Sequence, residues 1–596
     1  MSASSAILFI CLFIPMTLLA QQDSLEEIEV NGSKDPSSFT LSNSVVVGID
    51  ESGPQSLSPL KSLLENIPGV IANQNGGPAG RVSFFMRGTE SRHVSFTIDA
   101  LKINDVSNND RQFDAAFLSS PFLRSMTVFK GPQAVLFGSD AMGGLIDMRT
   151  RKGESAPETR LNLSAGSFGT ASGSLSSDWK KSDHQGTLTY TQAHSDGFSR
   201  LNKKRFNAKE RDGSDSLQAT SSSIHRFGKN QTDLLLSFIN GRNELDGMTD
   251  DNSHNESRNH QYLLQQKTSH SFSKGTSLSL RNGLNRNQRF TRSLGFFGDQ
   301  TFTGDLIQNE LLLENKSSKY ELTGGLSSEH ESVKSAALDR AFDLHSLFLQ
   351  SLMRAGILSL QAGGRLEEHS RYGQFQTGSA GVSMEQNKQK IFLQYSQGFK
   401  APSLYQLHAP VFGDSSLVPE RNRSWETGWK YDRANLRTEI TFFQNKLSNL
   451  ITFTSGGFRN QGDYEVRGLD ASARWTFAQF ALRPGYTYQE FRNTETVILR
   501  RPRNSANLQA SWFVTEPLEL YGKLNWFSAR KDLTPDSGTA KLNGFETVDL
   551  GANFQDGLNT YSLQVINLLD REYEELYGYS VMPRSVFAGF GRKFSF

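Results

Sequence analysis

The chain has 596 residues, with 63 Lys and Arg against 62 Asp and Glu, so its net charge of +1 gives no field that would gather nucleic acid. Hydrophobic residues make up only 36%, whereas aromatic residues reach 11% and Gly outnumbers Pro by 51 to 17, a mixture typical of β-sheet and turns. A mean hydropathy of -0.48, with no uncharged apolar run of about 20 residues, excludes a bundle of membrane-spanning helices.

The N-terminus carries one apolar run, from Ala6 to Ala20, which is followed at once by the polar Gln21. We predict that residues 1–20 are a secretory signal peptide cleaved after Ala20. The alternative is a single-span anchor, which is disfavoured because the run is shorter than the ~20 residues that a bilayer crossing needs. The only cysteine, Cys11, lies in this run, so the mature chain would hold no thiol for a disulfide, a metal site or a nucleophile.

Residues 21–44 form a short acidic segment that ends before the first compact domain. Apolar and charged residues alternate through Glu27, Ile28, Glu29 and Val30. This alternation predicts a lone extended strand with which a partner protein pairs through main-chain hydrogen bonds. The alternative interpretation is an unstructured linker.

The residue pattern of 45–152 is typical of a compact mixed α+β domain with short secondary-structure elements. The patterns predict a helix at Leu57–Ile67, short strands at Arg81–Arg87 and His93–Asp99, and a turn or brief helix at Leu118–Phe122.

Residues 153–596 are a long series of segments in which apolar and polar residues alternate, separated by clusters of Gly, Asn, Asp and Ser. In Leu358–Leu366, for example, Leu358 and Leu360 alternate with Ser359 and Gln361. Such segments are strands with one apolar and one wet face, which occur both in soluble sandwiches and in membrane barrels.

Three features favour the membrane barrel. The chain carries an export signal, aromatic residues such as Trp475 and Trp512 fall near strand ends, and the chain ends in an aromatic strand at Val586–Phe596. Division of this region into about 22 antiparallel strands leaves roughly 20 residues for each strand and its connection, enough for the ~10-residue crossing of such barrels. A barrel of this width has an open lumen, and we predict that the domain at 45–152 fills it.

The most specific motif runs from Val128 to Ile146. It resembles the plug signature of TonB-dependent outer-membrane receptors, and the same order of short motifs appears at Ile67–Val70, Met86–Thr89 and Thr97–Ala100. A phosphate-binding loop is rejected because no Gly-Lys-Ser/Thr follows the glycines. The signature residues are Lys130, Gly131, Pro132, Gly138, Gly143 and Gly144.

Within that family, the likeness is greatest to the cobalamin (vitamin B12) receptors, on motifs such as Arg87–Val94, Phe399–Leu407 and Val418–Glu420. The resemblance covers nearly the whole mature chain. It implies an all-β transmembrane barrel with an N-terminal α+β plug in its lumen, in the outer membrane of a Gram-negative bacterium. It also implies that a scarce large ligand is actively imported, with energy supplied by the TonB complex, and that the protein is not an enzyme and requires no cofactor.

Further expectations follow from this resemblance. Glu27 to Val30 become the candidate TonB box, and the ligand is a cobalamin or related corrinoid, with a ferric siderophore or haem as alternatives and a passive channel as a more distant one. The receptor is expected to be a monomer surrounded by outer-membrane lipid and lipopolysaccharide, with no nucleic-acid partner.

Ligand contacts are expected from two polar plug loops, 73–80 and 104–113, where Asn75, Asn108, Asn109 and Arg111 are candidates for hydrogen bonds to amide groups. The alternative is that these residues only solvate the loop tips. Cobalamin receptors also gather carboxylates around Ca²⁺ in loops like those that hold Asp212, Asp215, Asp246 and Asp250. A solvated charge run is the alternative there, because Lys and Arg are abundant in the same loop.

Two histidines and three charged residues complete the candidates. His93 and His408 occupy places comparable to the haem-binding histidines of some family members, although hydrogen-bonded loop histidines are the plainer interpretation. Arg87, Asp99 and Asp140 lie in the plug motifs and are expected to form ion pairs between the plug and the wall, or within the plug.

Overall fold

The computed structural model describes residues 44–49, 59–153, 157–247, 249, 251, 255–292, 298–454, 456–493, 497–536 and 538–595. The predicted signal peptide, the candidate TonB box at Glu27 to Val30, the candidate calcium ligand Asp250 and the terminal Phe596 lie outside these residues. No helix among the described residues is long and apolar enough to cross a membrane.

The N-terminal domain is a small mixed sheet with short helices. Its sheet has the strand order β1-β6-β7-β4-β5, a separate hairpin joins β2 and β3, and the β4–β7 pair is parallel. The elements are β1 (Ser44–Gly48), α2 (Pro59–Leu64), β2 (Val70–Gln74), β3 (Val82–Met86), η1 (Ser91–His93), β4 (Val94–Ile98), β5 (Leu101–Lys102), β6 (Leu123–Lys130), α3 (Ala134–Phe137) and β7 (Gly144–Thr150).

The predicted short strands therefore exist, each shorter than expected by one residue at either end. The helix is also shorter, because it ends at Leu64 and residues 65–67 form a turn before Pro68. Residues 120–122 form a bend and a turn, as one of the two predicted possibilities for residues 118–122. The core of the domain is apolar and closed, with Phe84, Phe96 and Val128 each exposed by 1% or less.

The remainder of the chain is a closed antiparallel barrel of 22 strands, in which the last strand, β33, pairs with the first, β8. Closure leaves no edge, so every strand finds its main-chain partners inside the barrel. The strands are β8 (Glu158–Gly166), β9 (Thr170–Lys181), β10 (His184–Ser195), β11 (Ser214–Phe227), β12 (Asn230–Leu245), β13 (Asn255–Ser273), β14 (Thr276–Arg292), β15 (Gln300–Lys316), β16 (Tyr320–Lys334), β17 (Asp339–Ala355), β18 (Leu358–His369), β19 (Gly373–Gln386), β20 (Gln389–Lys400), β21 (Glu420–Arg433), β22 (Leu436–Ser448), β25 (Tyr464–Phe477), β26 (Phe480–Arg492), β27 (Asn504–Thr515), β28 (Leu518–Phe527), β31 (Phe545–Asp556), β32 (Asn559–Ile566) and β33 (Ser585–Ser595).

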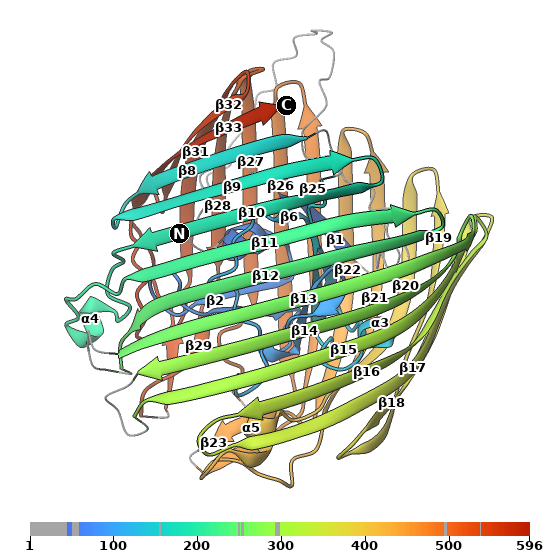
Figure 1. The fold of residues 1–596 in the computed structure, drawn as a ribbon. Helices are drawn as coiled ribbons and strands as arrows, with labels where there is room; N and C mark the ends of the chain where they lie inside the picture. Colours follow the sequence, from blue (N-terminus) through green and yellow to red (C-terminus); the bar gives the residue numbers. More distant parts are fainter. Residues whose placement is uncertain are drawn as a thin grey trace, which may run out of the picture.

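Turns of two or three residues join the strands at one end of the barrel, and most of the connections at the other end are longer. The long connections carry α4 (Lys203–Phe206), α5 (Leu404–His408) and two hairpins, β23 (Ile451–Thr454) with β24 (Gly457–Asn460) and β29 (Arg530–Leu533) with β30 (Thr539–Leu542). We call these the short-turn end and the long-loop end. In Figure 1 the blue N-terminal domain lies within the ring of strands.

The alternation predicted from the sequence is the alternation of the wall. On β18, Leu360 is 55% exposed on the outer face while Gln361 is 4% exposed toward the lumen. Trp475, Trp512 and Trp526 also face outward. Water or plug therefore meets the polar side of each strand, and lipid meets the apolar side.

Candidate functional site

The candidate site is the interface between the N-terminal domain and the inner wall of the barrel, where buried charges meet. Arg87 follows β3 and is 2% exposed. Its Nε lies 2.8 Å from Asp470 Oδ2 on β25, and its NH1 lies 2.8 Å from Glu426 Oε2 on β21. Lys130 adds a second cation, with its Nζ 3.6 Å from Asp470 and donating to the carbonyl of Pro68 at 3.0 Å. Two cations therefore face two carboxylates, as charges out of water require.

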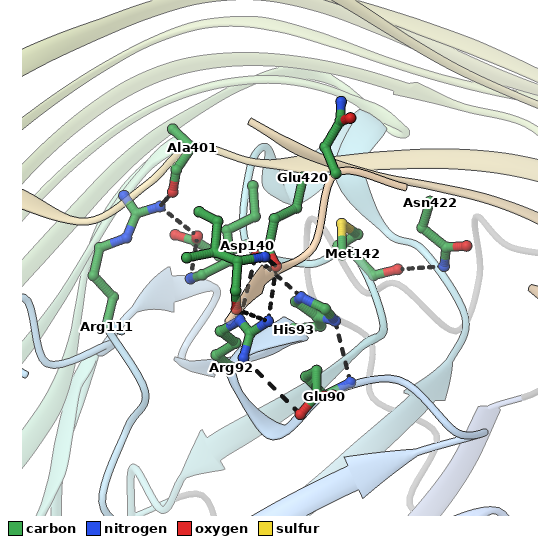
Figure 2. Close-up of polar contacts among 12 residues, drawn as sticks. Glu90, Arg92, His93, Arg111, Asp140, Met142, Ala401, Glu420 and Asn422 are labelled. Carbon is green, nitrogen blue, oxygen red and sulfur yellow. Dashed lines mark hydrogen bonds and ion pairs between the residues drawn. The ribbon is translucent and has the colours of Figure 1, made fainter. Parts of the chain in front are cut away.

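A second cluster surrounds Asp140, in the plug signature. Arg111 NH2 and Lys400 Nζ lie 2.9 and 2.8 Å from the same Asp140 oxygen, and Arg111 NH1 lies 2.9 Å from Glu331 on β16. Arg111 also donates to the carbonyl of Ala401 at 2.7 Å (Figure 2). Burial alone would raise the pKa of Asp140, but Arg111 and Lys400 outweigh burial and hold the pKa below its usual range.

A third cluster involves His93, at the end of η1. Its Nδ1 accepts a hydrogen bond from the main-chain N–H of Glu90 at 3.1 Å, and its Nε2 lies 3.2 Å from Glu420, which also binds Arg92 at 2.8 Å (Figure 2). Because Nδ1 accepts, the ring hydrogen lies on Nε2 and points to the carboxylate. Burial lowers the pKa of His93. Both nitrogens are thus occupied, and His93 has none left for a haem iron, whereas His408 is half-buried on α5.

Asp99, the remaining charged candidate, binds within its own domain. Its carboxylate accepts from the main chain and hydroxyl of Thr150, and Lys152 Nζ lies 3.3 Å away. Lys152 in turn reaches Asp233 on β12 at 3.1 Å, so Asp99 is joined to the wall through one intervening lysine.

The signature glycines lie where the backbone passes very close to other atoms. Gly131 has a φ of +105°, and a Cβ there would collide with the carboxylate of Glu426. At Gly144 a Cβ would lie 2.7 Å from the carbonyl oxygen of Phe129 and would collide with Met86. A side chain at either position would push the domain away from the wall or disrupt its own sheet.

The four predicted ligand contacts have different surroundings. Asn109 is exposed and Asn75 is half-buried, so both remain candidates. Asn108 is buried and donates to the carbonyl of Gln112 at 3.2 Å, and Arg111 is held by the ion pairs described above. Asn108 and Arg111 would have to leave internal partners to reach a ligand.

Two of the predicted calcium ligands converge at the long-loop end. Asp212 and Asp246 lie with Glu210, which the sequence analysis missed, so that one carboxylate oxygen from each falls within 4.8 Å of the others. Asp212 is 1% exposed; its Oδ2 accepts from the main chain of Arg200 at 2.7 Å, and its Oδ1 has no hydrogen-bond partner among the described residues. Burial, and then the neighbouring carboxylates, raise the pKa of both Glu210 and Asp212 to about 7.

Asp215 was expected in the same loop, and that expectation was wrong. The residue lies within β11, and its carboxylate is on the outer face, 2.7 Å from His194 Nδ1 and 3.6 Å from Arg242 NH1. Because alternate residues of a strand face opposite sides, a position inside the strand cannot share the loop cluster.

The acidic partners on the wall were not among the predicted site residues; they are Glu426, Asp470, Glu331 and Glu420. A signal for them exists, since Glu426 follows the outward Trp425 and Asp470 follows the outward Leu469 within alternating segments. A buried carboxylate on the lumen face of a strand needs a positively charged partner, so such a residue predicts a cation on the plug.

Comparison with known families identifies both domains. Residues 37–145 match the model described as TonB-dependent Receptor Plug Domain, and residues 139–568 match the model described as TonB dependent receptor-like, beta-barrel. The chain belongs to the TonB-dependent receptor family. It is therefore an outer-membrane transport protein of a Gram-negative bacterium and not an enzyme, it needs no cofactor, and its partners are TonB and a small-molecule ligand. The N-terminal domain is the plug, and the long-loop end of the barrel faces the outside of the cell.

Solved structures share this architecture at low sequence identity. The FrpB iron transporter from Neisseria meningitidis (F3-3 variant) matches with a TM-score of 0.78 and 13% identity, covering 91% of this chain and 100% of that one. A mutant of the ferric enterobactin receptor PfeA from Pseudomonas aeruginosa matches with 0.79 and 14%, covering 92% and 98%. The ferric-catecholate import receptor Fiu from K12 E. coli matches with 0.78 and 14%, covering 94% and 99%.

The Arg87 cluster yields a stability prediction for the plug of this receptor. Arg87→Met removes the ion-pair partner of buried Glu426 and leaves buried Asp470 with Lys130 as its one ion-pair partner among the described residues, so the free energy of plug opening should fall by about 3–5 kcal/mol. Native-state hydrogen exchange of the plug amides measures this quantity. As a control, Arg492→Met removes a solvent-exposed pair with Glu490 on β26 and should change it by less than about 1 kcal/mol. Equal effects of the two substitutions would contradict the proposed role of Arg87.

Proposed function

We propose that this receptor captures a scarce metal chelate at the cell surface and imports it at the expense of TonB-transmitted energy, and that the chelate is a corrinoid such as cobalamin. Capture at low external concentration requires tight binding, and a nanomolar Kd corresponds to about -12 kcal/mol. Release is then slow, because affinity is expressed mainly in the dissociation rate. An external source of energy must therefore loosen the complex.

The observation that favours a corrinoid is the convergence of Asp212 and Asp246. These are residues marked by the resemblance to cobalamin receptors, which use such loops to hold Ca²⁺. Each of the three carboxylates brings one oxygen within 4.8 Å of the others, which is three of the six to eight oxygens that Ca²⁺ prefers, and Oδ1 of Asp212 has no hydrogen-bond partner among the described residues. A bound cation would join the loop after β10 to the loop after β12 and would fix both beside the entrance.

A ferric siderophore is the second candidate. The solved structures with the same architecture include receptors named for ferric enterobactin and ferric catecholates. Their identities of 13–14% support the common fold more than a common cargo. Haem has less support, because His93 is fully occupied by Glu90 and Glu420.

The candidate TonB box, Glu27 to Val30, fits the same function, since an alternating segment can add to a partner as a strand. A monomeric state and contact with lipopolysaccharide remain predictions.

Cargo identity is tested by equilibrium binding to the purified receptor. Cyanocobalamin should bind with a Kd of about 1 nM, equivalent to about -12 kcal/mol. Ferric enterobactin and haemin should bind much more weakly. Tight binding of ferric enterobactin alone would replace the corrinoid by the siderophore and leave the import function in place.

The acidic cluster is tested separately by calcium titration in a calorimeter. Asp212→Asn and Asp246→Asn should each weaken Ca²⁺ binding at least about tenfold, because affinity follows the number of charged ligands. Asp215→Asn is the matched control and should bind Ca²⁺ as the unaltered receptor does. If all three variants bind alike, the cluster is not a calcium site.

The TonB box is tested with uptake of radiolabelled cyanocobalamin by cells. Ile28→Pro removes a main-chain N–H and should abolish uptake while leaving surface binding intact. Ile28→Val keeps the N–H and the strand propensity and should retain uptake. Normal uptake by the proline variant would show that TonB engages the chain elsewhere.

A further inference from the structure

The plug fills the lumen unevenly. Against β12, β14 and β15, it packs so tightly that wall glycines touch it: a Cβ on Gly283 would lie 2.9 Å from Leu101, and one on Gly304 would lie 2.5 Å from the main chain of Ser107. Lys102 closes the same side, with its Nζ 2.9 Å from Glu329 on β16. Among the described residues, the plug and the wall are therefore in direct contact at these positions.

The other side of the lumen holds a cavity of about 1110 Å³ between the described parts of the plug and wall. Its wall is the arc formed by β20–β22, β25–β28 and β31–β33, and its plug face comes from β1, α2 and the residues around β2. The cavity exceeds the ~300–1,000 Å³ of ordinary ligand pockets. It also reaches Lys388 and Ala434 in turns of the short-turn end and Ser580 in a connection of the long-loop end, so it extends nearly the whole height of the barrel.

At the long-loop end, the connection 567–584 reaches over this cavity to the plug. Glu575 on that connection is 6% exposed, and its two oxygens lie 2.7 and 2.9 Å from Lys61 Nζ on α2. One oxygen also accepts the main-chain N–H of Gln74 at 2.8 Å. Asn73 makes a nearby contact, donating to the carbonyl of Arg500 at 3.1 Å.

The connection that bears Glu575 is itself anchored outside the plug, to the β29–β30 hairpin and to the start of β31. Arg530 donates to the carbonyl of Glu574 at 2.6 Å, and Asp532 accepts the main-chain N–H of Tyr577 at 2.8 Å. Tyr573 stacks on Phe545 with ring centroids 3.9 Å apart. Glu575 is therefore held by contacts outside the plug, so we expect Lys61 and Glu575 to separate by movement of the plug side.

We propose that cargo crosses the receptor between the plug and this arc of the wall, and that the contact of Glu575 with Lys61 and Gln74 is the latch that closes the outer end of the route. The inference rests on the import function proposed above and adds the route and its closing contact. Lys61 lies on the first described helix and, in the sequence, between the candidate TonB box and Arg87, so tension transmitted along the chain from the periplasm reaches the latch before it reaches the Arg87 cluster.

The route is tested without cargo or TonB, by ion conductance of the purified full-length receptor in planar bilayers bathed in KCl. Glu575→Ala should raise the open fraction about tenfold over the unaltered receptor. This is the expected effect of losing one charge-assisted contact that changes the closed–open equilibrium constant by a factor of about ten. Lys61→Ala should raise it as well, but less, because the contact with Gln74 remains. The double variant should match Glu575→Ala, since both substitutions remove the same contact.

Glu329→Ala is the matched control, because it breaks a buried Lys–Glu contact between plug and wall on the tightly packed side of the lumen, and neither Lys102 nor Glu329 lines the proposed route. It should leave conductance unchanged. Heat-dependent migration on denaturing gels reports whether each variant still forms a folded barrel. Unchanged conductance in folded Glu575→Ala, or an equal rise in Glu329→Ala, would overturn the proposal. Either result is independent of which cargo binds, so it is distinguishable from a failure of the proposed function.

Discussion

Charge burial between plug and wall is the constraint on which the rest of the structure depends. A charge removed from water is tolerated only beside opposite charge, and removal of one partner costs far more than the pair contributes. Arg87 therefore fixes where Glu426 and Asp470 lie on two wall strands, and Arg111 does the same for Asp140 and Glu331. Each cluster therefore fixes one segment of the plug at one position along the barrel axis.

The choice of ion pairs also explains how a plug can be both sealed and removable. An apolar interface of the same size would be stabilised by the exclusion of water, and it would expose apolar surface to water whenever the plug opened. Charged faces regain hydration when they separate, so an opened plug presents surfaces that water solvates well. The closed state is nevertheless specific, because each guanidinium matches only a carboxylate at the correct height and angle.

Much of this architecture is readable from the sequence, because barrel strands obey a strict period of two. The alternation around Leu360 and Gln361 predicts which side chains face lipid, and the glycines at 131 and 144 mark backbone that must pass close to other atoms. The pairing of Arg87 with Asp470 is not readable in this way. It depends on the stagger between strands and on how the plug is rotated in the lumen, and both are set by the whole barrel.

The acidic loops likewise show which features can be predicted from local sequence and which depend on the whole fold. Composition places several carboxylates near one another in the chain, but only the point where β11 begins decides that Asp212 lies in the loop and Asp215 on the outer wall. Glu210 joins the cluster because the loop folds back on itself, which no spacing rule predicts. Residue types near one end of a strand thus indicate that a site exists, while the strand boundary determines its members. For this reason the corrinoid hypothesis depends more on where the carboxylates converge than on how many of them the loops contain.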